Sequence, residues 1–352
     1  MDALVARILD DCRSSYAQEE YPCLYDQINK WSVERPFEGM CLLDATPIFT
    51  NTLIKYAALL AGGAQVHLAE PKVMPHDPDA LALAQSYGLK LVDPEVISLP
   101  YDVVMDCAGY LSQVPSRLGY VELTKSGEEA YKACDLPVWM VDSGKIKQIE
   151  TCLGTGESFF RAMDSLGHTS WGEGSLVVVG YGKVGRGIVL EALRRGIKVR
   201  IVDVAPRDVP ETCELILAED SRSVKKAMDE AYAVVTATGI KHAMASLSSS
   251  VDFSSINALF ANMGVEDEWG DDIPEVRVLN AKAPLNFILH DPTLMCFIDP
   301  PLALHNHGVL ELMEAKSGQK GLWMPPQEVE DYYLDIVSST QSVPQDLLKH
   351  LL

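Results

Sequence analysis

The sequence contains no apolar run that approaches the roughly 20 residues needed to cross a bilayer. It also lacks an excess of positive charge, because 29 Lys and Arg stand against 50 Asp and Glu, giving a formal net charge of −21. That balance argues against nucleic acid or an anionic membrane surface as a partner. Internal repeats and low-complexity tracts are absent as well. We therefore expect an ordinary globular protein with no nucleic-acid partner and no membrane attachment.

Paired CxxC motifs are also missing. The eight cysteines lie far apart, at positions 12, 23, 41, 107, 134, 152, 213 and 296, which favours reduced thiols over disulfides or zinc. His305 and His307 flank Asn306, but no third ligand follows at helical spacing, so we expect no metal. The chain starts with an acidic amphipathic segment, unlike the basic start of a signal peptide, and we expect a cytoplasmic protein.

The most informative motif follows the apolar run Ser175–Val179. Gly180 permits a tight turn, Gly182 lets the backbone approach a pyrophosphate, and Gly185 lets the next helix pack closely on the sheet. The pyrophosphate would lie at the helix N-terminus, where N–H groups and the helix dipole favour an anion. A second strand ends at Asp203, whose carboxylate can accept both ribose hydroxyls and repels a 2′-phosphate. The pattern predicts NAD over NADP, with S-adenosylmethionine as the alternative ligand of such a loop.

Strand-like and helix-like segments alternate along the chain, which is typical of parallel sheets covered by helices. Predicted strands cover residues 39–44, 65–69, 90–92, 101–106, 175–179, 197–203, 233–239 and 258–264. Predicted helices cover residues 51–61, 79–87, 126–134, 150–166, 188–195, 221–231, 302–316 and 327–337, so that a helix-rich bridge joins the two halves. With 352 residues the chain exceeds what one core usually holds. We predict an α/β protein with a substrate-binding domain at 1–155, a Rossmann-type doubly wound NAD domain at 156–298, and C-terminal helices at 299–352 that return to the first domain.

The order of motifs resembles adenosylhomocysteinase, the NAD-containing hydrolase of S-adenosylhomocysteine. The loop Gly180-Tyr-Gly-Lys-Val-Gly-Arg-Gly187 is similar to the family's Gly-Tyr-Gly-Asp-Val-Gly-Lys-Gly, and residues 142–158 are similar to its lysine-containing segment. Thr236-Ala-Thr-Gly239 and Asn262-Met-Gly264 match its cofactor contacts Thr-Thr-Thr-Gly and Asn-Ile-Gly. Residues 101–109 are similar, more loosely, to its Leu-Asp-Asp-Gly-Gly stretch. The resemblance implies NAD contacts from Gly180, Gly182, Lys183, Val184, Gly185, Asp203, Thr236, Thr238, Gly239, Asn262, Gly264 and Asn286.

The resemblance also implies a reaction. In that family, bound NAD oxidises the ribose 3′-hydroxyl, the thiol leaves by elimination, water adds, and the ketone is reduced again. Such chemistry needs a general base and a dry, closed cleft. The matching positions imply catalytic roles for Lys145, Asp106 and Glu150, and substrate contacts from Asp44, Thr46, Glu122 and His305. The register of the lysine segment differs by one residue, so Lys147 is the alternative to Lys145.

The sequence departs from the family at two histidines. The histidine that follows Asn-Ile-Gly is Val265 here, and the histidine of the family's Leu-His-Met-Thr segment is replaced by Asp44. We predict an NAD-dependent enzyme acting on S-adenosylhomocysteine or a related hydroxyl-bearing small molecule, working as a homo-oligomer, either a dimer or a tetramer. Three alternatives stay open: a plain NAD-dependent dehydrogenase, a transferase that binds S-adenosylmethionine in the glycine loop, and a regulatory paralogue without turnover.

Overall fold

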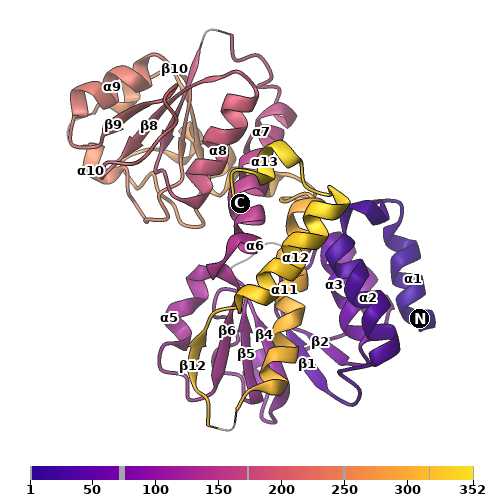
Figure 1. The fold of residues 1–352 in the computed structure, drawn as a ribbon. Coiled ribbons are helices and arrows are strands. Elements are labelled where there is room, and N and C mark those ends of the chain that lie inside the picture. Colours follow the sequence, from indigo (N-terminus) through magenta and orange to yellow (C-terminus); the bar gives the residue numbers. More distant parts are fainter. Residues whose placement is uncertain (1, 71–75, 173, 249–250, 317, 352) are drawn as a thin grey trace. The chain divides into compact units, whose positions relative to one another are not determined.

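The computed structural model describes residues 2–70, 76–172, 174–248, 251–316 and 318–351, and its contacts divide the chain into two compact units. The first unit combines the residues up to Ile149 with those from Met295 onward, and the second covers Glu150–Leu294. In Figure 1 the orange helix at Met295–Glu314 accordingly lies beside the purple strands of the first unit. Within the described residues, no helix combines the length and the apolar character needed to cross a bilayer.

The first unit is built on a seven-stranded parallel sheet in the order β12-β6-β5-β4-β1-β2-β3. Its strands are β1 Cys41–Asp44, β2 Gln65–Leu68, β3 Lys90–Leu91, β4 Tyr101–Asp106, β5 Ser116–Glu122, β6 Pro137–Met140 and β12 Gly321–Trp323. The chain leaves β1 toward β2 on one side and returns as β4 on the other side. The order therefore reverses between β1 and β4, which is where open α/β sheets place ligands.

Helices cover this sheet. The helices of this unit are α1 Ala3–Cys12, α2 Pro22–Glu34, α3 Thr50–Ala61, α4 Pro78–Ser86, α5 Glu128–Tyr131, α6 Lys145–Gln148, α11 Met295–Glu314, α12 Gln327–Thr340 and α13 Gln345–Leu348. The local sequence determines where two of these helices begin. Asp2 caps α1 by accepting the Leu4 N–H (2.9 Å), and Asp77 caps α4, whose first residue is Pro78. Helix α11 packs against β5, α2 and α3, so the C-terminal segment completes the first unit.

The second unit is a five-stranded parallel sheet in the order β11-β10-β7-β8-β9, again with a reversal, here between β7 and β10. The strands are β7 Ser175–Val179, β8 Lys198–Asp203, β9 Glu214–Leu217, β10 Ala231–Thr236 and β11 Leu259–Asn262. The helices are α7 Thr155–Ser165, α8 Lys183–Arg194, α9 Ser221–Asp229 and α10 Ala245–Ser248, and a π-helical turn at Ile149–Gly154 precedes α7. This arrangement is that of a doubly wound, Rossmann-type unit.

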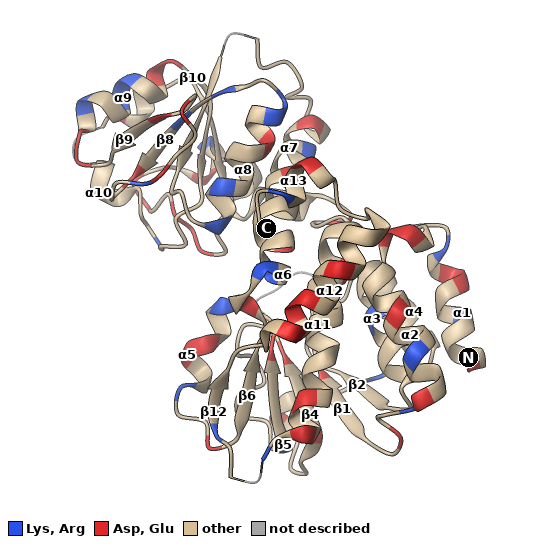
Figure 2. Cartoon of the chain, in the orientation of Figure 1, with Lys and Arg blue, Asp and Glu red and all other residues tan. Residues whose placement is uncertain are grey.

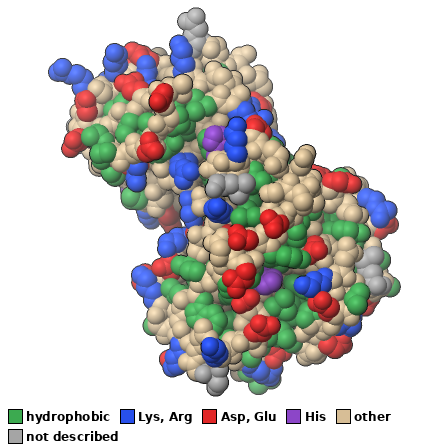
Figure 3. All heavy atoms as spheres, viewed as in Figure 1, with side chains coloured by type: hydrophobic (Ala, Val, Ile, Leu, Met, Phe, Trp, Pro, Cys, Tyr) green, Lys and Arg blue, Asp and Glu red, His purple; other side chains and the backbone are tan. Residues whose placement is uncertain are grey.

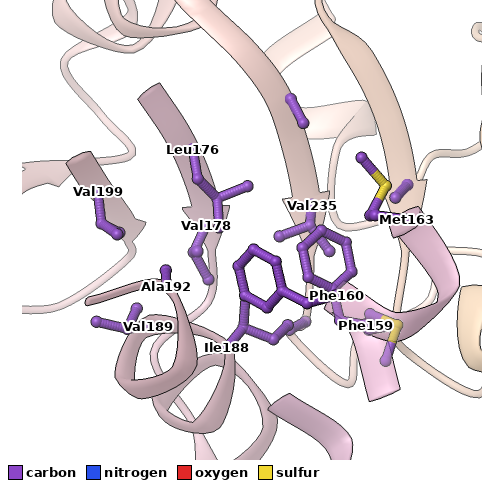
Figure 4. Packing of buried hydrophobic residues seen from close by; sticks show 14 of the residues in the cluster. Phe159, Phe160, Met163, Leu176, Val178, Ile188, Val189, Ala192, Val199 and Val235 are labelled. Carbon is purple, nitrogen blue, oxygen red and sulfur yellow. The ribbon is translucent and has the colours of Figure 1, made fainter. Parts of the chain in front are cut away.

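One side of the second sheet is packed by α7 and α8. Figure 4 shows Phe159 and Phe160 of α7 and Ile188 of α8 against Val178 of β7 and Val235 of β10. The two helices also approach each other closely, because a Cβ atom at residue 156 would collide with the backbone of residue 187. This packing holds the start of α8 rigidly at the carboxyl end of β7.

The predicted α/β class is confirmed, since both sheets are parallel and covered by helices. The prediction of a helix-rich bridge was wrong in its first half, where β5 and β6 lie and the helix expected at 126–134 reaches only Glu128–Tyr131. Strands β9 and β12 were also missed, and α11 begins at Met295, several residues before the expected 302. The domain roles proposed from the sequence remain predictions.

Candidate functional site

The glycine loop of the second unit has the geometry that a dinucleotide site needs. Gly180 has a φ of +95°, and a Cβ there would lie 2.7 Å from the carbonyl oxygen of Ala237. A Cβ at Gly185 would collide with the carbonyl oxygen of Gly180, whereas one at Gly182 would meet nothing within 4 Å in the described part of the chain. Gly182 is also the N-cap of α8, and no side chain of a described residue caps that helix. Backbone at the positive end of the helix dipole therefore faces open space, which fits a pyrophosphate.

Asp203 ends β8 beside this loop. Its carboxylate accepts the N–H groups of Tyr181 (2.9 Å) and Ala205 (3.1 Å), and Arg207 pairs with it at 3.2 Å. Burial acts to raise the pKa of Asp203, but these N–H groups and Arg207 outweigh that effect and hold the pKa below its usual range. A carboxylate has about four lone-pair sites, so it keeps acceptor capacity for ribose hydroxyls while ionised.

If the glycine loop binds NAD, Asp203→Ala should shift the ratio of affinities toward NADP by at least about tenfold, or ~1.4 kcal/mol. The variant loses the hydroxyl acceptor and the charge that repels a 2′-phosphate, and it frees Arg207 to pair with that phosphate. Titration calorimetry with both cofactors measures the ratio. An unchanged ratio would mean that Asp203 does not face the ribose.

The carboxyl ends of β10 and β11 lie on the other side of the strand-order reversal from β7 and β8. Thr236 donates its hydroxyl to Asn262 Oδ1 (3.1 Å), and Asn262 Nδ2 donates to the carbonyls of Gly264 (3.0 Å) and Lys282 (2.7 Å). The Asn262 amide thus shapes the turn after β11 from within. Val265, in place of the family's histidine, is 64% exposed.

Glu268 is a buried carboxylate at this edge that the sequence did not reveal. It accepts the N–H groups of Thr238 (2.8 Å) and Gly239 (2.7 Å), and burial raises its pKa. Asn286 lies further along, in a 3₁₀ turn at Leu285–Ile288, and donates to the Pro292 carbonyl (3.3 Å). Glu268 fixes the loop after β10, so the candidate contacts Thr238 and Gly239 are held in place from the β11 side.

In the first unit, Asp44 and Asp106 end the two strands that flank the reversal of strand order. Asp44 accepts the Thr46 N–H (2.8 Å) and forms an ion pair with Lys55 of α3, and neither side chain of the pair is exposed. Burial lowers the pKa of Lys55, and Asp44 acts against that effect. Nothing in the sequence pointed to Lys55 except a charged residue inside an apolar helical segment.

Asp106 and Glu122 are two buried carboxyl groups that lie opposite each other on the neighbouring strands β4 and β5. Tyr131 donates its hydroxyl to Asp106, and Glu122 accepts the N–H groups of Ala108 and Gly109 (both 3.0 Å). Burial raises the pKa of Asp106, and the charge of Glu122 raises it further. Burial raises the pKa of Glu122 as well. The pair therefore retains a proton more readily than free carboxyls do, which suits proton transfer.

The candidate lysines lie on α6. Lys145 is partly exposed and Lys147 is buried, and the start of the helix is held by Glu330 of α12, which accepts the Ile146 N–H at 3.0 Å. Helix α12 carries several acidic residues, seen as red segments in Figure 2. Glu150 lies in the π-helical turn assigned to the second unit, so the structure places it in a different unit from Lys145 and Asp106.

His305 of α11 completes the buried polar groups of the first unit. It is fully buried, and its Nε2 lies 2.9 Å from the Val121 carbonyl. Burial, together with the charge of Lys55, lowers the pKa of His305 to about 3. Asn306, the next residue of α11, donates its amide to the Lys55 carbonyl (3.2 Å), so α11 brings His305 near Lys55, whose partner Asp44 also accepts the Thr46 N–H. Among the described residues, no group of three potential ligands could hold a metal ion.

Comparisons with known proteins bear on both units. No protein-family model matches the chain. It is 23% identical over 259 residues to adenosylhomocysteinase from Thermoplasma acidophilum, a match that covers 65% of this chain and 63% of that protein. It is 24% identical over 260 residues to S-inosyl-L-homocysteine hydrolase from Methanothermobacter thermautotrophicus, covering 64% of this chain and 60% of that protein. The chain thus matches only part of these relatives' length, and its similarity to them is distant.

Two solved structures are similar to the chain at low identity. A dipicolinate synthase structure from Bacillus halodurans matches 79% of this chain and 99% of its own, with 11% identity and a TM-score of 0.47. An NADPH-dependent glyoxylate/hydroxypyruvate reductase from Sinorhizobium meliloti matches 64% of this chain and 72% of its own, with 13% identity and a TM-score of 0.30. These likenesses concern the α/β fold alone.

Proposed function

We propose that this protein, a distant relative of the two hydrolases, is an NAD-dependent enzyme that transiently oxidises a hydroxyl of a nucleoside thioether or a related metabolite. The observation that carries the proposal is the open backbone at Gly182 beside the ionised Asp203, because that combination binds a pyrophosphate and a ribose together. The distant similarity to adenosylhomocysteinase and S-inosyl-L-homocysteine hydrolase supports the choice of substrate class.

Each unit has residues suited to one part of the work. Gly182 and the first turn of α8 hold the pyrophosphate, and Asp203 orients the ribose. NAD, when bound, supplies the reversible oxidation of the substrate hydroxyl. In the first unit, the pair of Asp106 and Glu122 is the candidate for holding or releasing a proton, because the pKa of each is raised by burial.

The experiment is release of a thiol by the purified protein supplemented with NAD. S-adenosylhomocysteine and S-inosylhomocysteine are tested side by side, because the names of the two relatives differ in the nucleobase of the substrate. Homocysteine release from either compound, without net formation of NADH, supports the proposal. Net NADH without thiol would favour a plain dehydrogenase, and a melting temperature raised by S-adenosylmethionine but not by NAD would favour a transferase.

Lys145→Ala should lower the rate of thiol release by about 100-fold or more, with NAD affinity unchanged, if Lys145 moves the proton in the slow step. Lys147→Ala, made in parallel, resolves the register of this segment. Lys132→Ala is the matched control, because Lys132 also lies in the first unit but is exposed and pairs with Glu129 at the surface. Loss of activity in Lys147→Ala while Lys145→Ala stays active would reassign the role to the buried lysine.

A further inference from the structure

The loop that follows β8 places a cation beside the carboxylate that ends this strand. Asp203 Oδ1 accepts the Ala205 N–H (3.1 Å), which turns the chain, and Pro206 restricts the next backbone φ. The turn returns Arg207 to the same carboxylate, with its Nε 3.2 Å from Oδ1. The short loop therefore holds the guanidinium at the carboxyl edge of the second sheet.

The arginine is the exposed member of this ion pair. The side chain of Asp203 is 5% exposed and that of Arg207 is 46% exposed. Val204, which lies between them in the chain, is 82% exposed, so the loop is open to a ligand. The contact with Asp203 is made by Nε, which leaves the terminal nitrogens of the guanidinium able to donate. A ligand that approaches the end of β8 therefore meets the guanidinium as well as the carboxylate.

Asp203 itself has little acceptor capacity left. Oδ1 already faces the Ala205 N–H and Arg207 Nε, and Oδ2 accepts the Tyr181 N–H (2.9 Å). A carboxylate offers about four lone-pair positions, so about one remains, on Oδ2. Asp203 can thus accept one ribose hydroxyl but not both. The second hydroxyl, or a phosphate group attached to it, needs another partner.

The chemistry of that partner suits a phosphate. A guanidinium offers parallel N–H donors that match two phosphate oxygens, and it stays charged at any physiological pH. The charge of Arg207 also offsets that of Asp203, so the pair presents no net negative charge to an incoming anion. A further cation lies nearby, because the charge of Arg186 lowers the pKa of Tyr181 by more than the charge of Asp208 raises it. The repulsion that an unpaired carboxylate exerts on a 2′-phosphate is therefore largely cancelled.

We propose that Arg207 is a specificity-determining residue that lets the nucleotide site bind NADP as well as NAD, by pairing with the 2′-phosphate of the adenosine ribose. This inference rests on the proposed function for the class of ligand, a dinucleotide, and widens the choice of cofactor. Asp203 accepts one ribose hydroxyl, and Arg207 binds the phosphate on the other. The preference for NAD is then small, because the acid that would enforce it is already paired.

The test compares the affinities of NAD and NADP for the full-length protein by titration calorimetry. Wild-type protein should bind NADP within about tenfold of NAD. Arg207→Gln should weaken NADP binding by at least about tenfold and change NAD binding by less than about threefold, because only NADP carries the 2′-phosphate. Lys198→Gln is the matched control: Lys198 is exposed at the opposite end of β8, and its loss changes the net charge equally.

A second measurement locates the phosphate on the protein. Phosphorus-31 NMR separates the 2′-phosphate of bound NADP from the pyrophosphate, and a free phosphate monoester titrates near about pH 6. Contact with Arg207 favours the dianion, so this titration should move to lower pH in the wild type and return toward the free value in Arg207→Gln.

The outcomes separate this inference from the proposed function. The inference is overturned if the wild type binds NADP more than about tenfold more weakly than NAD, or if Arg207→Gln weakens both cofactors equally. A 2′-phosphate that titrates alike in wild type and variant would overturn it as well. None of these results touches thiol release with NAD, which tests the proposed function separately. Binding of neither dinucleotide would overturn both.

Discussion

Gly182→Ala is expected to weaken NAD binding by at least about tenfold, or ~1.4 kcal/mol, without lowering thermal stability. The added methyl group meets nothing within 4 Å among the described residues, and the φ of −79° at this residue suits alanine. The methyl group would instead obstruct a ligand that approaches the N-terminus of α8. Titration calorimetry with NAD and a thermal melt of the same sample measure the two effects.

Gly185→Ala is the matched variant, one turn of helix away. Here the methyl group would collide with the Gly180 carbonyl oxygen and lie 3.4 Å from a Val178 methyl group, so the glycine turn or α8 must move. We expect this variant to lose both NAD binding and thermal stability. If Gly182→Ala bound NAD as tightly as the wild type, the loop would not hold the pyrophosphate, and the proposed function would lose its main support.

The nucleotide-type unit could be predicted because its signals are local. The apolar strand, the three glycines and Asp203 all lie within residues 175–203, and each glycine has a separate steric reason that a single sequence displays. The charge of the surface could also be predicted directly from the composition. Figure 3 shows acidic and basic side chains interspersed over the visible face, as expected for a chain of ordinary composition with a net charge of −21.

The first unit was harder to predict because its elements are completed by distant parts of the chain. Strand β12 is only three residues long and is held in the sheet by pairing with β6, where Gly321 lies opposite Pro137 from far earlier in the chain. From the sequence alone, Lys55 is an unexplained charged residue in an apolar helix. Its role becomes visible only in the fold, where Asp44 of β1 and His305 of α11 lie near it. Periodicity reports the face that an element buries, but it does not report which polar side chain from elsewhere will meet it.

Asp299 of α11 makes the stability of the first unit depend on pH. It is fully buried, and its two carboxylate oxygens accept the N–H groups of Cys23 (2.9 Å) and Leu24 (2.8 Å) in the first turn of α2. Burial raises the pKa of Asp299 to about 7, despite these hydrogen bonds. In the unfolded chain the same group has a pKa of about 3.9. Between those two values the folded state binds the proton more tightly than the unfolded state does.

The sign of the effect follows from that difference. The stabilisation from the bound proton is full below about pH 4 and is lost as the pH rises through about 7, by at most on the order of 4 kcal/mol. Asp299→Asn cannot titrate and keeps one acceptor for α2, so its thermal midpoint should fall less between pH 5 and 8 than that of the wild type. Asp10→Asn is the control, since Asp10 is exposed and its ion pair with Arg13 lies at the surface. In both variants the thermal midpoint should still fall to some extent as the pH rises, because the raised pKa of Asp106 acts in the same direction. A wild-type slope in Asp299→Asn would show that the proton on Asp299 does not control the docking of α2 on α11.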